Sequence, residues 1–315
     1  MENSQIKLLD YLRSKTQVDL DTFDMDELSK DSRRSVLDKA IELATQLLDQ
    51  YPTVTQEELT IEIGAILLAI QVRPFVTGNI HIMVNPNYAY YQRKTVEAAK
   101  RLHHLFHEID PSFDPSRLVL KIAATWEGLQ ACRELHYSRI QTLATTLFTM
   151  EQAVLAGEVG CVSISPFVHE LKAIFQPSYK GSDSLLPLCV QAQQWYLQES
   201  LPTKVKACAT MGLDEILQLA GVAAFTLVPD DLKLLQTTQK NEAEVQSLSL
   251  FQGLSTLQVK VTYPSYVNDE AGYRTAFARA EEGRAQLKLG QAIHIFCDFQ
   301  TKAEQLVRDA KKCDA

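Results

Sequence analysis

The stretch that decides the fold is LVLKIA, residues 118–123. A nearly unbroken apolar run of this length is typical of a parallel strand, because helices cover both faces of a parallel sheet. One residue breaks the run, since Lys121 stands in its middle. Strand alternation places Lys121 on the same face as Val119 and opposite Ile122. If the sheet closes into a barrel, one of these two faces lines the interior.

A lysine at such a position has a chemical use. Burying an ammonium group is costly, so a buried lysine is expected to give up its proton more easily. The free amine attacks carbonyl groups and forms a Schiff base. The competing interpretation is a lysine at a strand end that reaches solvent or pairs with a carboxylate. Lys206, in VKACAT (205–210), is a similar candidate on a less apolar strand.

Strand patterns recur along the chain and alternate with helical spacing. The expected strands cover residues 17–23, 79–84, 118–123, 140–145, 160–165, 205–210 and 223–228. The expected helices cover residues 32–51, 55–71, 96–109, 127–137, 150–156, 185–198, 214–220 and 230–235, and two more lie near 270–286 and 288–311. Thr55 and Glu58 predict a capping box at the start of the second helix. Residues 237–268 show a less regular pattern.

This alternation predicts an α/β fold, a (β/α)₈ barrel with right-handed crossovers. The pattern supplies seven strands, and the missing N-terminal strand falls within residues 24–55, where two helices follow one another. A doubly wound open sheet is the competing fold. Its dinucleotide-binding form carries a glycine-rich turn after the first strand, whereas here Asp-Met-Asp-Glu-Leu follows Phe23. We expect one domain over residues 1–315, with the barrel core in 1–236 and an irregular segment plus C-terminal helices in 237–315.

Composition restricts the partners of the chain. Among 315 residues, 31 Lys and Arg face 39 Asp and Glu, a net charge of −8, which argues against a nucleic-acid partner. The longest apolar run, residues 63–72, is too short to span a bilayer, so we expect no membrane partner. The N-terminus lacks the apolar core of a signal peptide, and the six cysteines are scattered. These features predict a cytoplasmic protein with reduced thiols.

Four segments resemble the transaldolase family. They are LVLKIAATWEG (118–128), TLATTLFTMEQAVLAGEVGCVSISPFV (142–168), GLDEILQLAG (212–221) and FTLVPDDLKLL (225–235), and the most specific is the K-x-A-x-T-W-x-G run that starts at Lys121. The resemblance implies a class I aldolase-type barrel whose lysine forms a Schiff base with a ketose. It implies that a C–C bond is cleaved and a dihydroxyacetone unit passes to an aldose, a step of the pentose phosphate pathway. It implies no cofactor, because the iminium accepts the electrons.

The resemblance also implies roles for single residues. Lys121 matches the Schiff-base lysine, Asp21 the first-strand aspartate that acts as general acid and base, and Thr145 the threonine that helps hold the catalytic water. Asp19 faces the same way as Asp21 and is an alternative to it. The expected substrate-binding residues are Ser165 and Phe167, which match the pocket serine and aromatic of the family, together with His169 and Asn85.

Other family positions are changed. The glutamate of the third barrel strand falls at or near Met83, with His81 and Asn85 as the nearest polar residues. The asparagine on the strand of Thr145 falls at Leu143. These two replacements make the expected pocket more apolar.

The largest departures concern phosphate. The two arginines that hold the sugar phosphate fall at Glu170 and Met211, and the Thr-Thr-Asn-Pro segment of the second strand has no counterpart. Arginine forks and helix N-termini are the usual phosphate binders, so phosphate affinity is expected to fall by orders of magnitude. We therefore expect Schiff-base chemistry on a less charged, carbonyl-containing or sugar-like substrate. The missing strand is either a true loss or a coding segment lost after Phe23.

Alternatives remain open. A catalytically degenerate homologue that acts as a binding or regulatory protein would also account for the missing strand and the lost arginines. A homodimer is a further open possibility. His103 and His107 have the i, i+4 spacing of a zinc-binding pair, but no third ligand accompanies them, so we predict no metal.

Overall fold

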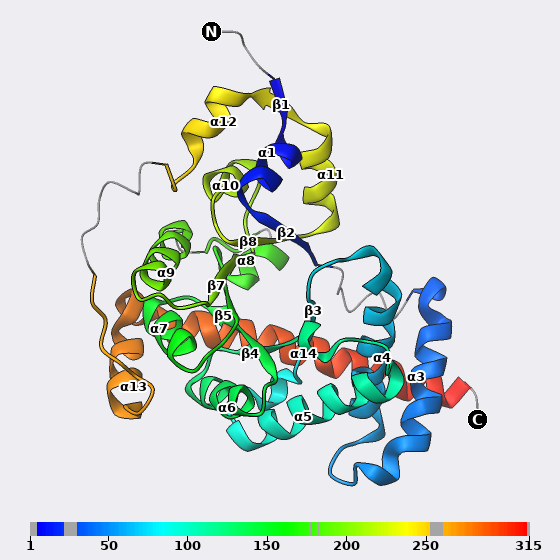
Figure 1. Cartoon of the computed structure of the whole chain (residues 1–315). Helices are drawn as coiled ribbons and strands as arrows, with labels where there is room; N and C mark the ends of the chain where they lie inside the picture. The colour runs from blue at the N-terminus through cyan, green and yellow to red at the C-terminus, as the bar shows by residue number, and fades with distance from the viewer. Residues whose placement is uncertain (1–4, 22–29, 177, 182, 253–260, 314–315) are drawn as a thin grey trace.

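A curled parallel sheet forms the centre of the computed structural model, which describes residues 5–21, 30–176, 178–181, 183–252 and 261–313 (Figure 1). Its seven strands run in the order β2-β8-β7-β6-β5-β4-β3, and every neighbouring pair is parallel. The strands are β2 (Gln17–Leu20), β3 (Ile80–Met83), β4 (Leu118–Ala123), β5 (Gln141–Leu147), β6 (Ser163–Pro166), β7 (Lys204–Ala207) and β8 (Ala224–Leu227). This is the (β/α)₈ barrel class, and all seven predicted strands are confirmed.

The sheet is open between β2 and β3, where a regular barrel has its second strand. Residues 30–79, which the structure describes throughout, contain helices and no strand. The missing strand predicted within 24–55 therefore agrees with the described part of that range, while residues 24–29 lie outside the described residues. A helical hairpin of α3 (Arg34–Leu47) and α4 (Gln56–Val72) stands beside β3 instead.

Helices cover the outer face of the sheet in the predicted alternation. They are α5 (Gln92–Ile109), α6 (Trp126–Tyr137), α7 (Met150–Glu158), α9 (Leu186–Gln198), α10 (Leu213–Gln218) and α11 (Pro229–Thr237). The short helix α8 (Leu171–Phe175), which the sequence pattern did not predict, follows β6. Leu118, Leu120 and Ile122 of β4 join the large apolar core that these helices close. The predicted cap of α4 is confirmed on one side, since the Thr55 hydroxyl accepts a hydrogen bond from the Glu58 amide at 3.1 Å.

The C-terminal segment ends in one long helix. α13 (Glu270–Arg279) is followed by the 3₁₀ turn η7 (Ala280–Gly283) and by α14 (Arg284–Cys313). Glu281 and Glu282 have φ of 53° and 57°, left-handed values that break the helix several residues before the predicted boundary. α14 contacts η4 (Pro86–Tyr88), which follows β3, and also β5 and α8, which follows β6. It therefore crosses the carboxyl ends of the barrel strands, as the long red helix behind the sheet in Figure 1 shows.

Besides α8, four short elements escaped the sequence prediction. β1 (Gln5–Lys7) pairs antiparallel with β9 (Gln239–Asn241), and α1 (Leu8–Lys15) leads into β2. α12 (Glu242–Leu248) follows β9, so the start of the segment 237–268 is more regular than we expected. These elements lie together at one end of the molecule (Figure 1).

Candidate active site

Lys121 points into the barrel. Its strand neighbours Leu120 and Ile122 belong to the apolar core under the helices, whereas Val119 is fully buried but stands outside that core. Alternation therefore puts Val119 and Lys121 on the inner face. Lys121 is in register with Met83 on one side and Leu143 on the other, so its flanks are apolar. Within the described part of the chain, its amine has no hydrogen-bond or ion-pair partner.

Lys206, the second interior lysine, is paired. Its ammonium forms an ion pair with Asp19 Oδ2, and the Lys206 side chain is 9% exposed. The same ammonium lies 3.4 Å from His81 Nε2. Gln17 Nε2 donates to the other oxygen of Asp19 at 2.8 Å. The alternative that we stated for an interior lysine, pairing with a carboxylate, therefore describes Lys206.

His81 lies among the interior charges. Burial lowers its pKa to about 3, and the positive charges of Lys206 and Lys121 act in the same direction. The imidazole is therefore neutral at ordinary pH. Since Nε2 faces the Lys206 ammonium, we assign Nε2 as the acceptor and place the ring proton on Nδ1.

The depressed pKa of His81 predicts a pH dependence of folding. The unfolded chain binds a proton on this residue below about pH 6.5 and the folded chain does not, so stability is full above that pH and falls on acidification. We expect this residue to lower the free energy of unfolding by about 1.4 kcal/mol for each pH unit below pH 6. Urea unfolding between pH 7 and 4.5 measures it: His81→Gln should flatten the slope, while His136→Gln at an exposed position should not. Equal slopes in both variants would contradict the assignment.

Cys208 is a thiol that was not predicted as part of the site. It is hydrogen-bonded to Ser165 and feels the charges of Asp21 and Lys121. Cys208 follows β7, and burial raises the pKa of its thiol to about 11, while the Ser165 hydrogen bond and the charge of Lys121 act against this rise. The negative charge of Asp21 adds to the rise. Ser165 Oγ and Cys208 Sγ are 3.1 Å apart, and the Asp21 amide donates to Leu227 O at 2.9 Å. The carboxyl ends of β2, β4, β6 and β7 thus bring these groups into one region.

Thr145 presents a buried hydroxyl to the same interior. The residue is 1% exposed, and its Oγ1 has no hydrogen-bond partner among the described residues. The strand bulges directly after it, where the register shifts and Thr146 takes a left-handed φ of 55°. Gln152 of α7 fixes the bulge, because its amide donates to Ala124 O at 2.8 Å and accepts from the Phe148 amide at 2.8 Å. Buried hydroxyls are normally hydrogen-bonded, so the Thr145 hydroxyl is available to bind a water molecule.

Phe167 forms an aromatic wall at the mouth of the barrel. It is 5% exposed, and its ring centroid lies 5.6 Å from Phe148 and 6.4 Å from Phe296 of α14. Phe167 thus packs against α14, the helix that crosses the carboxyl ends of the strands.

Internally bonded carboxylates lie around His169, Glu170 and Met211. His169 Nε2 lies 2.7 Å from Glu215 Oε1, and Glu215 Oε2 accepts from the Met211 amide at 2.7 Å. Glu170 Oε2 accepts from the Tyr179 hydroxyl at 2.6 Å and from Gln291 Nε2 at 3.3 Å. The sequence pointed to His169, Glu170 and Met211, but it did not predict their hydrogen-bond partners. Two carboxylates, those of Glu170 and Glu215, therefore lie in this region.

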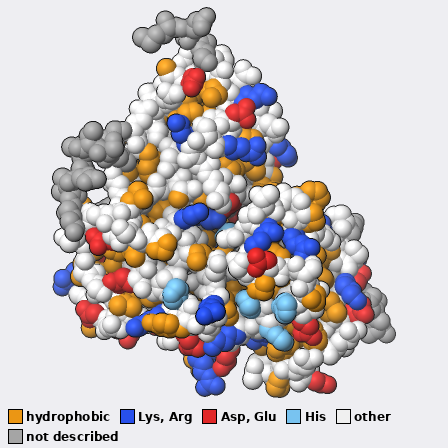
Figure 2. Space-filling view, in the orientation of Figure 1, with side chains coloured by type: hydrophobic (Ala, Val, Ile, Leu, Met, Phe, Trp, Pro, Cys, Tyr) orange, Lys and Arg blue, Asp and Glu red, His pale blue; other side chains and the backbone are white. Residues whose placement is uncertain are grey.

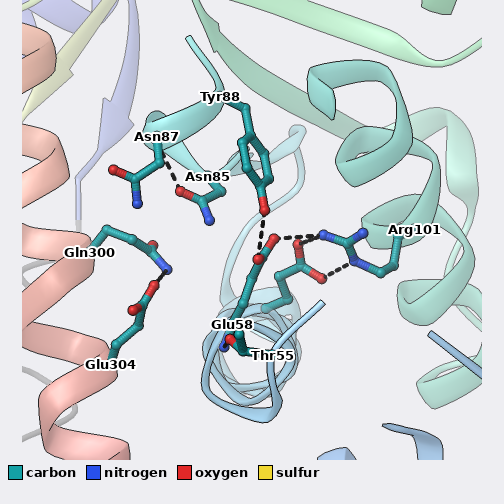
Figure 3. A network of polar contacts seen from close by, with 9 residues as sticks. Thr55, Glu58, Asn85, Asn87, Tyr88, Arg101, Gln300 and Glu304 are labelled. Carbon is teal, nitrogen blue, oxygen red and sulfur yellow. Dashed lines mark hydrogen bonds and ion pairs between the residues drawn. The ribbon is translucent and has the colours of Figure 1, made fainter. Parts of the chain in front are cut away.

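Asn85 belongs to a turn at the end of β3. Its side-chain oxygen accepts from the Asn87 amide at 3.0 Å, which caps η4, and the residue is 8% exposed. Figure 3 shows this contact beside the chain end of β3. This hydrogen bond gives Asn85 a local role in the turn.

Histidines gather over α5 and α6 on the face seen in Figure 2. His103 and His107 of α5 lie beside Phe106 and Phe113 around a shallow surface depression. Burial lowers the pKa of His103, and its histidine neighbours contribute. Among the described residues, no three His, Cys, Asp or Glu side chains come together as a metal site. In the same part of the chain, no helix has both the length and the apolar character needed to cross a membrane.

Comparison with known proteins identifies the family. The family model described as Transaldolase/Fructose-6-phosphate aldolase matches residues 27–281. A transaldolase of Aeromonas salmonicida (strain A449) is 30% identical over 248 residues, covering 77% of this chain and 74% of the relative. A transaldolase of Marinomonas sp. (strain MWYL1) is 29% identical over 249 residues, covering 78% and 75%. Transaldolase B of Pasteurella multocida (strain Pm70) is 26% identical over 327 residues, covering 95% and 98%. The chain therefore belongs to the Transaldolase/Fructose-6-phosphate aldolase family.

Proposed function

We propose that this protein is a transaldolase-type enzyme in which Lys121 forms a Schiff base with a ketone or ketose and a C–C bond is made or broken. The observation that carries the proposal is the contrast between the two interior lysines. Lys206 is committed to Asp19, whereas the Lys121 amine lies on the inner face between apolar neighbours and has no described partner. An unpaired amine in a partly desolvated site is the form of lysine that attacks carbonyls. The relatives named transaldolase support the same reaction class.

The proposed reaction uses the groups at the barrel mouth. The Lys121 amine adds to the ketose carbonyl, and the carbinolamine loses water to give an iminium. Asp21 then takes the proton of the substrate hydroxyl while the adjacent C–C bond breaks and its electrons pass to the iminium. An aldehyde leaves and a neutral enamine stays on Lys121. The unpaired Thr145 hydroxyl supplies a hydrogen bond to a water or a substrate hydroxyl in these steps.

The substrate in this proposal carries no phosphate. Glu170 and Glu215 place two carboxylates in the region where the family holds a sugar phosphate, and both accept hydrogen bonds from within the chain. A phosphate there would meet like charges without the arginine fork that would offset its desolvation. Ser165, Phe167 and His169 serve in the proposal as the walls of a pocket for a neutral polyol or simpler carbonyl compound.

Trapping with borohydride tests the proposed function. The intact protein is incubated with dihydroxyacetone, fructose or fructose 6-phosphate, reduced, and weighed by mass spectrometry. We expect one reduced adduct per chain with an unphosphorylated carbonyl and less adduct with the phosphate ester at equal concentration. The absence of an adduct with every carbonyl tried would contradict the enzyme proposal and favour a binding or regulatory homologue.

A double substitution tests the proposal about phosphate. Glu170→Arg with Met211→Arg restores two positive side chains, and we expect at least about a tenfold gain in adduct formation with fructose 6-phosphate at limiting concentration. Fructose should gain little, because it has no charged group to bind. Glu199→Arg with Leu197→Arg, which makes the same charge change of +3 at two exposed positions, is the matched control. An equal response to both sugars would count against the phosphate argument.

A further inference from the structure

Asp19, His81 and Lys206 form a polar layer inside the barrel. They come from β2, β3 and β7, and β3 and β7 stand four strands apart in the curled sheet, on opposite walls of the barrel. The interior layers of such barrels are normally filled by branched apolar side chains from alternate strands. A buried ion pair there costs desolvation energy that an apolar replacement would not. This costly ion pair therefore lies on the same inner face of the barrel as Lys121.

The ion pair has a defined polarity. The Lys206 ammonium lies between Asp19 and His81, 3.4 Å from His81 Nε2. At His81 the positive charge of Lys206 acts more strongly than the negative charge of Asp19, and the charge of Lys121 acts on the same imidazole. The positive end of the pair therefore lies toward His81, on the inner face of the barrel that also carries Lys121. Gln17 holds the far oxygen of Asp19 at 2.8 Å and so helps to fix the orientation.

We propose that Lys206 is a positioning residue whose fixed ammonium, anchored by Asp19 and His81, shifts the Schiff base on Lys121 from the cationic iminium to the neutral enamine. This inference rests on the proposed function. Two positive charges in a partly desolvated chamber repel each other, and the repulsion ends when the nitrogen becomes neutral. The enamine forms from the iminium when its α carbon loses a proton to a base or when the C–C bond to the departing aldehyde breaks. In both cases the electron pair left on carbon neutralises the nitrogen.

The consequence is a longer-lived enamine. Return to the iminium requires a proton on carbon and restores the repulsion, so the fixed cation opposes release of the carbonyl unit by hydrolysis. The enamine is instead left for an acceptor aldehyde, whose carbonyl carbon it attacks. Lys206 thereby favours transfer of the bound unit over its loss to water.

Dihydroxyacetone serves as the probe, because its adduct has both an iminium and an enamine form. Borohydride reduces the iminium and tetranitromethane consumes the enamine, so the two reactions on the same protein give the ratio of the two forms. Lys206→Met removes the cation at similar length and should raise the ratio of iminium to enamine about tenfold. Lys206→Arg keeps a permanent cation and should leave the ratio within about twofold of the unchanged protein.

A second variant covers the case in which the unpaired Asp19 prevents folding of Lys206→Met. Asp19→Asn with Lys206→Met removes both charges, and a smaller rise of about threefold is expected, since the pair acts as a dipole. An unchanged ratio in the methionine variants, with a normal Lys121 adduct, would overturn this inference alone. A complete lack of adduct in the unchanged protein would overturn it together with the proposed function. Equal ratios for Lys206→Met and Lys206→Arg would also overturn it, because a purely structural role does not distinguish charge.

Discussion

Lys121→Met is expected to lower turnover at least about 10³-fold, because it removes the nucleophile that carries the covalent intermediate. Methionine is a conservative replacement in shape, and Met83 and Leu143 already flank the site with apolar side chains. The variant should therefore fold, which circular dichroism and thermal unfolding can check. Turnover is measured as transfer from the ketose that gives the most adduct in trapping to an acceptor aldehyde.

Lys204→Met is the matched control for this substitution. Lys204 is exposed at the start of β7, so the same chemical change falls outside the barrel interior. We expect turnover within about twofold of the unchanged protein, as for most exposed substitutions. A folded Lys121→Met protein with full activity would show that another group forms the intermediate.

Arg101→Met is expected to destabilise the protein by about 3–5 kcal/mol, the usual effect of removing one partner from a buried ion pair. Arg101 donates to both oxygens of Glu62 at 2.7 Å and to Glu58 at 2.8 Å, and its side chain is 8% exposed. Tyr88 donates to the second oxygen of Glu58 at 2.7 Å (Figure 3). The network fastens α4 to α5 and to the turn after β3, beside the opening in the sheet.

Urea unfolding measures this loss, and its pH dependence gives a second test. Burial already raises the pKa of Glu62 to about 7 in the presence of Arg101. A carboxyl with a raised pKa favours folding at low pH and loses that contribution as pH rises through the folded value. Arg101→Met should therefore lower the free energy of unfolding more at pH 8 than at pH 5. Arg93→Met on the exposed face of α5 should change stability by less than about 0.5 kcal/mol, and a similarly small effect for Arg101→Met would contradict the role of the network.

The strands were predictable because the fold buries them on both faces. The apolar run of β4 is typical of a strand buried on both faces, and the alternation of strand patterns with helical spacing located the other six strands. β1 escaped prediction because Gln5–Lys7 has too short and too polar a pattern. Its partner β9 lies more than 200 residues away, so only tertiary pairing defines it. The break at Glu281 and Glu282 was equally hidden, since nothing in glutamate predicts a left-handed backbone.

The candidate site was predictable where a charged residue interrupts an apolar strand pattern. Lys121 and Lys206 stand out in apolar strands, and the family resemblance adds Asp21 and Thr145. Which lysine is paired could not be read from the sequence, because Asp19 and Lys206 meet only when β2 and β7 curl around one chamber. The pairing of His169 with Glu215 and that of Glu170 with Gln291 are hidden for the same reason, since these partners belong to distant elements.

The most direct test of the account is to locate the adduct. The protein is incubated with dihydroxyacetone, reduced with borohydride and digested, and the modified peptide is sequenced by tandem mass spectrometry. Our account predicts one reduced adduct on Lys121, none on Lys206, and none in the Lys121→Met protein. An adduct on Lys206 or on an exposed lysine, with Lys121 unmodified, would contradict it.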